Sequence, residues 1–381
     1  MAFTERYVRA DADGNGDGTT DANSGATGSY TWAQMLQYAG TEATGGTLAD
    51  VRFNVKAGTY SRTTAADTFA TTDGAPTTAL PLHIRGFNAT IGDLEDNGRT
   101  QGGALVTTNF PAVTYTTGAL TVPTYCLIES MNVESAISGV AVNMTVGAHA
   151  VRCKFANTHA TSANARAASP VAGGNNLYED CDLSVASSNA GGVSLGIATG
   201  EARRCLLTAN TSGSGLVNIT GAASLIQCSL RDASYGVTGG TNSAITVEGC
   251  SYRNIALNYN NHGSTAGWYK VVNCVAWGSG GASVWYNSTT SVRWNYQANN
   301  AVGNMGSADV NEGDWPVYDQ VALTADPFTS SSDLTLNNTA GGGAACREVG
   351  LHPYIDIGAW QVQPATAAVL GAPNLRGFMQ G

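Results

Sequence analysis

Acidic and basic side chains stand beside two cysteines in the middle of the sequence. Asp180 immediately precedes Cys181, and Arg204 immediately precedes Cys205. One interpretation is a catalytic pair at Asp180 and Arg204, since paired carboxylates with shifted pKa values serve glycoside cleavage. An acid next to a base is also what a surface ion pair requires, and the sequence favours that second interpretation.

Aromatic side chains gather in the last third of the chain. The candidate binding residues are Trp268, Trp277, Trp285, Tyr286 and Trp294. Exposed aromatic side chains in such numbers mark a subunit interface or a platform for sugars. The alternative is that they pack beneath the irregular segment 299–333.

A short acidic stretch near the start resembles the opening of a calcium loop. Asp11, Asp13 and Asn15 alternate as the first ligands of such a loop do, but Ala22 occupies the twelfth position, where a bidentate glutamate is needed. A turn-rich cap loop without metal explains the same residues. Calcium therefore stays an open alternative, and the sequence predicts no other cofactor.

A ladder of cysteines organises the centre of the chain. The spacings between successive members are 28, 24, 23, 22 and 24 residues. The ladder consists of Cys153, Cys181, Cys205, Cys228, Cys250 and Cys274. A near-constant period of this length is typical of a repeat protein. Met131 lies 22 residues before Cys153 and extends the ladder backwards.

The intervals between the cysteines hold short β-branched or apolar runs separated by Gly-Gly, Ser-Gly and Asn-Asn turns. None contains an amphipathic helix, which disfavours helical solenoids. The pattern predicts an all-β parallel β-helix in which equivalent residues of neighbouring coils stack about 4.8 Å apart. Stacked cysteines are expected to be buried and reduced, because in-register side chains lie poorly for disulfide bonds.

The ends of the coil are predicted from local signals. Residues 1–50 form an N-terminal cap with a short helix that starts at the capping box Thr31 to Gln34. The β-helix spans residues 51–361 and includes a strand at Ala104-Leu-Val-Thr107, and residues 362–381 form an extended tail. After Cys274 the repeat fades, so residues 299–333 are expected to leave the coil.

Segments at both ends resemble the right-handed parallel β-helix repeat family of secreted bacterial and bacteriophage proteins. The matching segments are Asn54-Val-Lys-Ala-Gly-Thr-Tyr60 near the start and Asp356-Ile-Gly-Ala-Trp360 near the end. The resemblance implies the fold, whereas lyases, hydrolases, adhesins and phage spikes all use it. The signature motifs of the polygalacturonases and pectate lyases in this fold are absent from the sequence.

The formal net charge of −10 and the pI of about 4.9 argue against nucleic acid as a partner. The sequence begins without the apolar run of a signal peptide and contains no membrane-length apolar stretch, so we expect synthesis in a host cytoplasm without membrane insertion. Cysteines without CxxC pairs or Cys/His clusters fit reduced thiols better than a metal site.

These features favour a non-enzymatic bacteriophage virion protein, namely a decoration, fibre or spike subunit on the virion surface. We expect a homotrimer that contacts other virion proteins through the tail and that can meet a host surface polysaccharide. The alternatives are a polysaccharide-cleaving lyase or hydrolase and a carbohydrate-binding adhesin on the same fold.

Overall fold

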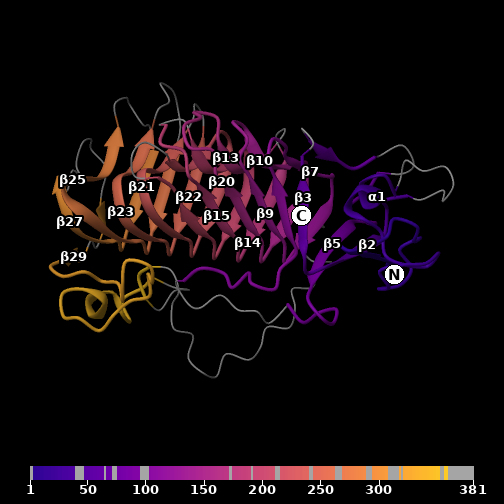
Figure 1. Cartoon of the computed structure of the whole chain (residues 1–381). Helices are drawn as coiled ribbons and strands as arrows, with labels where there is room; N and C mark the ends of the chain where they lie inside the picture. Colours follow the sequence, from indigo (N-terminus) through magenta and orange to yellow (C-terminus); the bar gives the residue numbers. More distant parts are fainter. Residues whose placement is uncertain are drawn as a thin grey trace.

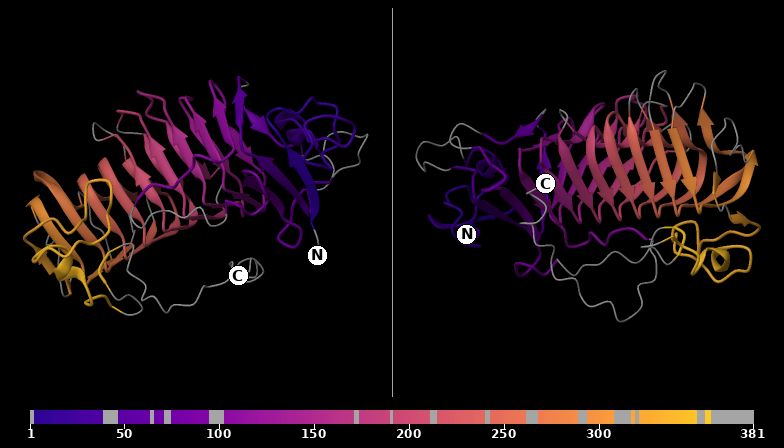
Figure 2. Two further views of the ribbon diagram at one scale, coloured as in Figure 1. Left: turned by 60° about the horizontal axis from the view of Figure 1, so that its bottom comes forward. Right: turned by 180° about the vertical axis from the view of Figure 1, so that it is seen from behind.

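The computed structural model is an elongated coil of short strands stacked along one axis (Figure 1). It describes residues 3–38, 47–63, 66–70, 75–94, 103–170, 174–189, 192–210, 215–239, 243–261, 268–288, 294–307, 317–318, 321–351 and 356–358. For some residues of the later strands it describes the backbone alone. The two further views show the same rod, with the early strands at one end and the late strands at the other (Figure 2).

The first sheet is parallel and contains 12 strands within the described part of the chain. Its strands, in spatial order, are β1 (Thr4–Val8), β2 (Val51–Lys56), β5 (Leu82–Phe87), β8 (Cys126–Glu129), β11 (His149–Val151), β14 (Asn175–Glu179), β17 (Thr199–Arg203), β20 (Ala222–Ile226), β22 (Ala244–Glu248), β24 (Trp268–Val272), β26 (Trp294–Ala298) and β28 (Val317–Tyr318). Each coil therefore adds one strand to this sheet.

The second sheet begins as two parallel rows that later merge. The first row is β3 (Thr59–Arg62), β6 (Ala112–Tyr115), β9 (Asn132–Ser135), β12 (Lys154–Asn157), β15 (Asp182–Val185) and β18 (Leu206–Thr208). The second row is β4 (Asp67–Thr68), β7 (Leu120–Val122), β10 (Val140–Met144), β13 (Arg166–Pro170), β16 (Val193–Ile197) and β19 (Gly215–Ile219). Both rows pair with the long strand β21 (Ser229–Gly239). The strands that follow are β23 (Ser251–Asn261), β25 (Val275–Ser288), β27 (Ala301–Ser307) and β29 (Val321–Leu323).

Each coil thus has three sides around one apolar core, and the predicted all-β parallel β-helix is confirmed. The inward residues of the first sheet alternate with outward polar ones, as Phe53 and Val55 do beside Arg52. Large buried side chains, Tyr178 and Phe155 among them, fill the space between the sides.

A column of thiols fills the inside of the corner between the first and second sheets. All eight cysteines are free and buried, and the six members of the ladder stack coil upon coil as predicted. Each ladder thiol donates to main-chain carbonyls, for example from Cys228 Sγ to Ala202 O at 3.3 Å. Burial raises the pKa of Cys181 and Cys250 well above the ordinary value, so these thiols stay protonated.

The residue before each ladder cysteine turns the chain through the corner with a left-handed backbone. Its φ is 54° at Asp180, 48° at Arg204, 52° at Gln227 and 59° at Gly249. This conformation costs a residue with a side chain roughly 1–2 kcal/mol. A main-chain hydrogen bond to the next coil offsets the cost, as from Gln227 N to Glu248 O at 2.9 Å. The corner side chains consequently stack one coil apart.

The coil continues beyond the end predicted from the sequence. The expectation that residues 299–333 leave the coil is wrong for β27, which pairs with β25 and β29. Asn300 takes the position of the cysteine in this coil. Its Oδ1 accepts a hydrogen bond from Cys274 N at 2.9 Å, and its Nδ2 donates to Val271 O at 3.1 Å. The Asn300 amide pairs with both the Cys274 N–H and the Val271 carbonyl, so it can replace the thiol at this position. The cysteine pattern alone therefore does not reveal this coil.

The N-terminal end is closed by the helix α1 (Trp32–Leu36). The predicted capping box is present, since Gln34 N donates to Thr31 Oγ1 and Thr31 N donates to Gln34 Oε1. Trp32, Met35 and Leu36 face the core. The strand β1 lies within the segment assigned to the cap and already belongs to the first sheet. None of the helices in the described ranges has the length and apolar character needed to cross a membrane.

Two segments cover the outer face of the second sheet. The first is a strap formed by residues 103–110. The strand predicted within it at 104–107 is absent, and Leu105 instead packs with Leu94 and Phe110 in a separate cluster. The Leu105 amide donates to the buried Asp182 Oδ2 at 2.6 Å, which fastens this strap to β15.

The second covering segment is a C-terminal lobe formed by residues 324–351 and 356–358, shown in yellow in Figure 1. It contains the 3-10 helix η2 (Gly343–Cys346) and packs on Val275 and Ala301 of the late coils. Arg253 of β23 also binds Asp326 of the lobe, with 2.7 Å between Nη2 and Oδ2.

The left-handed corner predicts opposite effects for two neighbouring positions. Gln227→Gly removes the conformational cost of a side chain at positive φ and should raise the free energy of unfolding by about 0.5–1 kcal/mol. Gly249→Val places a branched side chain at φ 59° and should lower it by about 1–3 kcal/mol. Urea unfolding of the two variants measures both changes. Equal stability of the two variants would contradict the stacked corner.

Candidate functional site

Asp180 and Arg204 meet across neighbouring coils, as their shared position before a cysteine predicts. Arg204 Nε lies 2.9 Å from Asp180 Oδ1 and Arg204 Nη2 lies 2.8 Å from Oδ2, so the pair is bidentate. Arg204 Nη2 also donates to Glu179 Oε1. The hydrogen bonds to Asp180 are the main reason that the pKa of Arg204 is raised.

This geometry is that of an ion pair. Both oxygens of Asp180 accept hydrogen bonds from the guanidinium, so the carboxylate has little capacity left to act as a base or a nucleophile. The second nearby acid, Glu179, binds the same arginine. The interpretation as a surface ion pair therefore describes the contacts at this corner better than a catalytic pair does.

A second set of charged side chains, linked by hydrogen bonds, crosses the early coils of the first sheet. Arg52 Nε donates to His83 Nδ1 at 3.0 Å, and His83 Nε2 lies 3.0 Å from Glu129 Oε2. Arg152 binds the other carboxylate oxygen of Glu129 and ends this set of contacts. Since the Nε–H of arginine can only donate, Nδ1 must accept and the imidazole proton resides on Nε2.

Both ring nitrogens of His83 are thus engaged, and the residue is 7% exposed. We assign it to holding the coils together. These contacts could not be predicted from the sequence, because the coil lengths before Met131 are irregular and the register between Arg52, His83 and Glu129 could not be counted.

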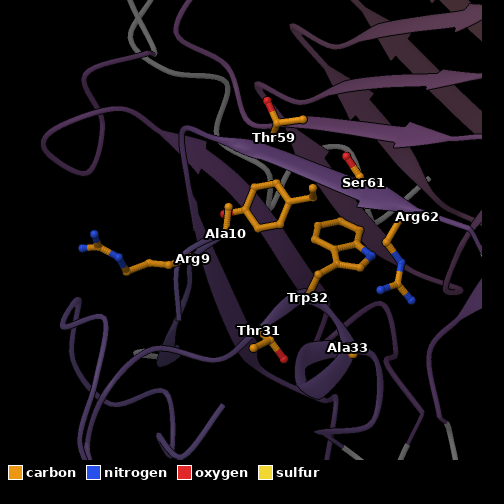
Figure 3. Close-up of a pocket in the computed structure, with 9 residues that line it drawn as sticks. Arg9, Ala10, Thr31, Trp32, Ala33, Thr59, Ser61 and Arg62 are labelled. Carbon is orange, nitrogen blue, oxygen red and sulfur yellow. The ribbon is translucent and has the colours of Figure 1, made fainter. Parts of the chain in front are cut away.

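A pocket of about 170 Å³ opens beside the helix α1 at the N-terminal end (Figure 3). We call it the Trp32 pocket. Thr59 and Ser61 project from β3, and Thr31 and Ala33 lie opposite them at the start of α1, with the Trp32 ring in between. Its remaining lining residues are Arg9, Ala10, Tyr60 and Arg62.

A buried carboxylate behind the pocket fixes its walls. Arg62 donates through Nε and Nη2 to Asp67 at 2.8 and 2.9 Å. Trp32 Nε1 and the Tyr115 hydroxyl donate to Asp67 Oδ2 at 2.8 and 2.9 Å. Burial opposes ionisation of Asp67, but these hydrogen bonds together outweigh it and hold the pKa of the carboxyl below its usual value.

The aromatic candidates are divided between the two sheets. The backbone register places Trp268 of β24 beside Trp294 of β26 in the first sheet. Trp285 and Tyr286 lie on β25 of the second sheet. The side chains of these four residues are outside the described part of the structure.

Trp277 is half-buried and packs against the cluster beneath the C-terminal lobe. That contact corresponds to the packed alternative considered for these residues. Whether the other four form an interface or a sugar platform stays a prediction.

The candidate calcium residues are engaged locally. Asp11 forms an ion pair with Arg9, at 2.7 Å between Nε and Oδ1. Asp13 Oδ1 accepts a hydrogen bond from the main-chain amide of Asn15 at 2.9 Å. Across the described ranges, no three His, Cys, Asp or Glu side chains gather in an arrangement that could hold a metal ion. The calcium loop stays a prediction, and the predicted tail 362–381 lies outside the described residues.

Comparison with known proteins identifies the fold. No protein-family model and no curated protein matches the sequence. The structure is similar to pectate lyase Pel9A, with a TM-score of 0.54 and 11% identity over 95% of this chain and 97% of the enzyme. It is also similar to a rhamnogalacturonan lyase, with a TM-score of 0.51 and 12% identity over 89% of this chain and 96% of the enzyme. Both are right-handed parallel β-helix proteins.

The chain has the right-handed parallel β-helix fold. At this level of identity the similarity extends to the fold alone, because one β-helix can host many different sites. The function of this β-helix has to be argued from its own side chains.

The Asp67 network predicts a pH-dependent loss of stability. At pH 7, Asp67→Asn should lower the free energy of unfolding of the β-helix by about 2 kcal/mol, because charged hydrogen bonds to a buried group are lost. A lowered pKa stabilises the fold above the unfolded value of about 4, and that contribution disappears as the pH falls through the folded value.

The difference between the wild type and Asp67→Asn should therefore shrink below about pH 4. Urea unfolding at pH 7 and pH 3 measures it. The matched control is Asp11→Asn, which removes an exposed ion pair and should cost at most about 1 kcal/mol at pH 7. A difference for Asp67→Asn that is equally large at both pH values would contradict the ionised state of Asp67.

Proposed function

We propose that this chain is a non-enzymatic surface protein that uses the β-helix as a rigid scaffold, of the kind carried by bacteriophage virions. The observation that carries the proposal is the pairing of Asp180 with Arg204, the one acid–base set that the sequence offered for catalysis. An acid held in a bidentate ion pair stabilises a corner, and both of its oxygens already accept hydrogen bonds from the arginine.

Two further carboxylates on the outer faces, those of Glu129 and Asp182, support the same conclusion. Glu129 binds both His83 and Arg152, and Asp182 accepts the Leu105 amide of the strap. The strap and the C-terminal lobe also occupy parts of the outer face of the second sheet, where a long polymer would otherwise lie.

A second candidate function is polysaccharide cleavage, which one observation favours. The two similar solved structures are named as a pectate lyase and a rhamnogalacturonan lyase, and each covers about nine-tenths or more of this chain. A shared fold is compatible with a related activity, but it does not supply the residues that would perform it.

The two candidates differ in a direct assay. Purified protein should not shorten pectate, rhamnogalacturonan or neutral polysaccharides, with or without added calcium, and Asp180→Asn should behave like the wild type. Release of unsaturated or reducing ends measures cleavage. Depolymerisation that disappears in a folded Asp180→Asn variant, while it persists in the exposed control Asp232→Asn, would replace the proposal with the enzymatic one.

Assembly into a homotrimer belongs to the same proposal and rests on the resemblance to phage surface proteins. The mass of the purified protein in solution should correspond to three chains. Deletion of residues 361–381 should leave a folded coil and lower the mass toward one chain, because we expect the apolar end of this tail to dock on a neighbour. Light scattering after size exclusion measures the mass, and a monomeric full-length protein would contradict the trimer.

A further inference from the structure

Arg166 begins the strand β13 and has no acidic partner among the described residues. Its Nη1 donates to Ser169 Oγ at 3.1 Å, and this is the one hydrogen bond that its side chain forms there. The segments 171–173, 190–191 and 211–214, which adjoin β13, β16 and β19 in the sequence and lie outside the described ranges, contain no Asp or Glu. Within the described part of the chain, Arg166 thus carries a charge that no carboxylate balances.

Two other arginines show what is missing at Arg166. Arg62 and Arg204 each bind an aspartate with the same edge of the guanidinium, the edge formed by Nε and Nη2. In Arg166 this edge has no partner within the described ranges, and both groups reach solvent, since neither is a fully buried donor. Two parallel N–H groups in this arrangement match the two oxygens of a carboxylate.

The surroundings of Arg166 favour an anion at this edge. The residue is half-buried, and burial lowers the pKa of Arg166, whereas hydrogen bonds to aspartates raise the pKa of Arg62 and of Arg204. A partly desolvated guanidinium gains more from an anion than a fully hydrated one does. The formal net charge of the chain is −10, so its long-range field does not attract anions and the recognition has to be local.

A column of small polar residues surrounds the guanidinium on the outer face of the second row, where β10 and β13 lie side by side (Figure 1). Four register partners of these strands lie in the core, namely Val142, Ala168, Leu195 and Val217. Because side chains alternate along a strand, the residue that follows each of them faces outward. The outward column consists of Asn143, Ser169, Gly196 and Asn218.

The glycine in this column leaves room for the arginine. A Cβ atom at Gly196 would lie 2.6 Å from Ser169 Oγ and 3.2 Å from Arg166 Nη1. Asn143 and Asn218 flank this pair, are half-buried, and form no side-chain hydrogen bond within the described ranges. Each amide can donate to and accept from a hydroxyl group. With strands about 4.8 Å apart, both amides are within reach of the substituents of one ring bound at Arg166.

We propose that Arg166 binds the carboxylate of a hydroxyl-rich acid, such as a single uronic acid unit. Nε and Nη2 donate to the two carboxylate oxygens, while Nη1 stays on Ser169. Asn143 and Asn218 exchange hydrogen bonds with the hydroxyl groups of the ligand. The site lies apart from Asp180, so it goes beyond the proposed scaffold function and stands whether or not the chain cleaves polysaccharides.

Three probes separate the carboxylate from the hydroxyl groups. Methyl glucuronide carries both, methyl glucoside carries only hydroxyl groups, and acetate carries only the carboxylate. Saturation-transfer NMR titrations of the full chain should show that the glucuronide binds about tenfold or more tightly than the glucoside, and about two- to tenfold more tightly than acetate. Absence of glucuronide binding, equal affinity for glucuronide and glucoside, or equal affinity for glucuronide and acetate would each overturn the proposal.

Variants of the site assign the contacts. Arg166→Gln removes the charge but can still donate to Ser169, and it should weaken glucuronide binding about tenfold or more. Arg166→Lys keeps the charge without the two parallel N–H groups and should weaken it about three- to tenfold. Asn218→Ala removes only a contact to the hydroxyl groups, so it should weaken glucuronide binding about two- to threefold and leave acetate binding unchanged.

The matched control is Lys154→Gln, which removes one positive charge from β12 in the first row, away from the column. Glucuronide binding by this variant should equal that of the wild type. Thermal unfolding confirms that each variant is folded, and Asn218→Ala tests the site even if Arg166→Gln is unstable. Equal loss of glucuronide binding in Lys154→Gln and Arg166→Gln would show that net charge, and not this site, is responsible.

Discussion

The structure depends on the requirement that each residue fit the same residue of the next coil, about 4.8 Å away. A residue must therefore pack well both within its own coil and against the equivalent residue of the next coil. Small buried thiols satisfy this condition inside the corner, where Cys181 and its equivalents stack fully buried. The corner residue satisfies it by a repeated left-handed conformation, held at each step by a hydrogen bond between coils.

The same stacking brings acidic and basic side chains of neighbouring coils into contact on the outer surface. Acids and bases of neighbouring coils pair at several positions, as Asp180 does with Arg204 in one column and Glu129 with Arg152 between two columns. These pairs join neighbouring coils through charged hydrogen bonds. The protein shares its fold with two lyases, while the paired charges favour a scaffold.

Hollows and covering segments lie where the repeat is broken. A regular coil presents nearly flat outer sides, and a hollow requires an element that does not stack. The Trp32 pocket forms where the helix α1 meets β3, at the irregular N-terminal end. The strap and the C-terminal lobe are likewise insertions, and they cover the second sheet. On the regular sides, recognition instead requires a side chain whose charge no neighbouring coil balances, as at Arg166.

The sequence by itself determined the β-helix, the buried thiols, the capping box at Thr31 and the pairing of Asp180 with Arg204, because a constant period lets the register be counted from the cysteines. Only the tertiary structure joined His83 to Glu129, placed Asp67 behind Trp32 and set Leu105 against Asp182. These partners lie 46, 35 and 77 residues apart. They come from coils of unequal length, where no spacing in the sequence fixes which side chains share a column. The role of Asn300 could not be predicted for a related reason. Its amide takes the place of a thiol through hydrogen bonds to neighbouring coils, which only the tertiary structure shows.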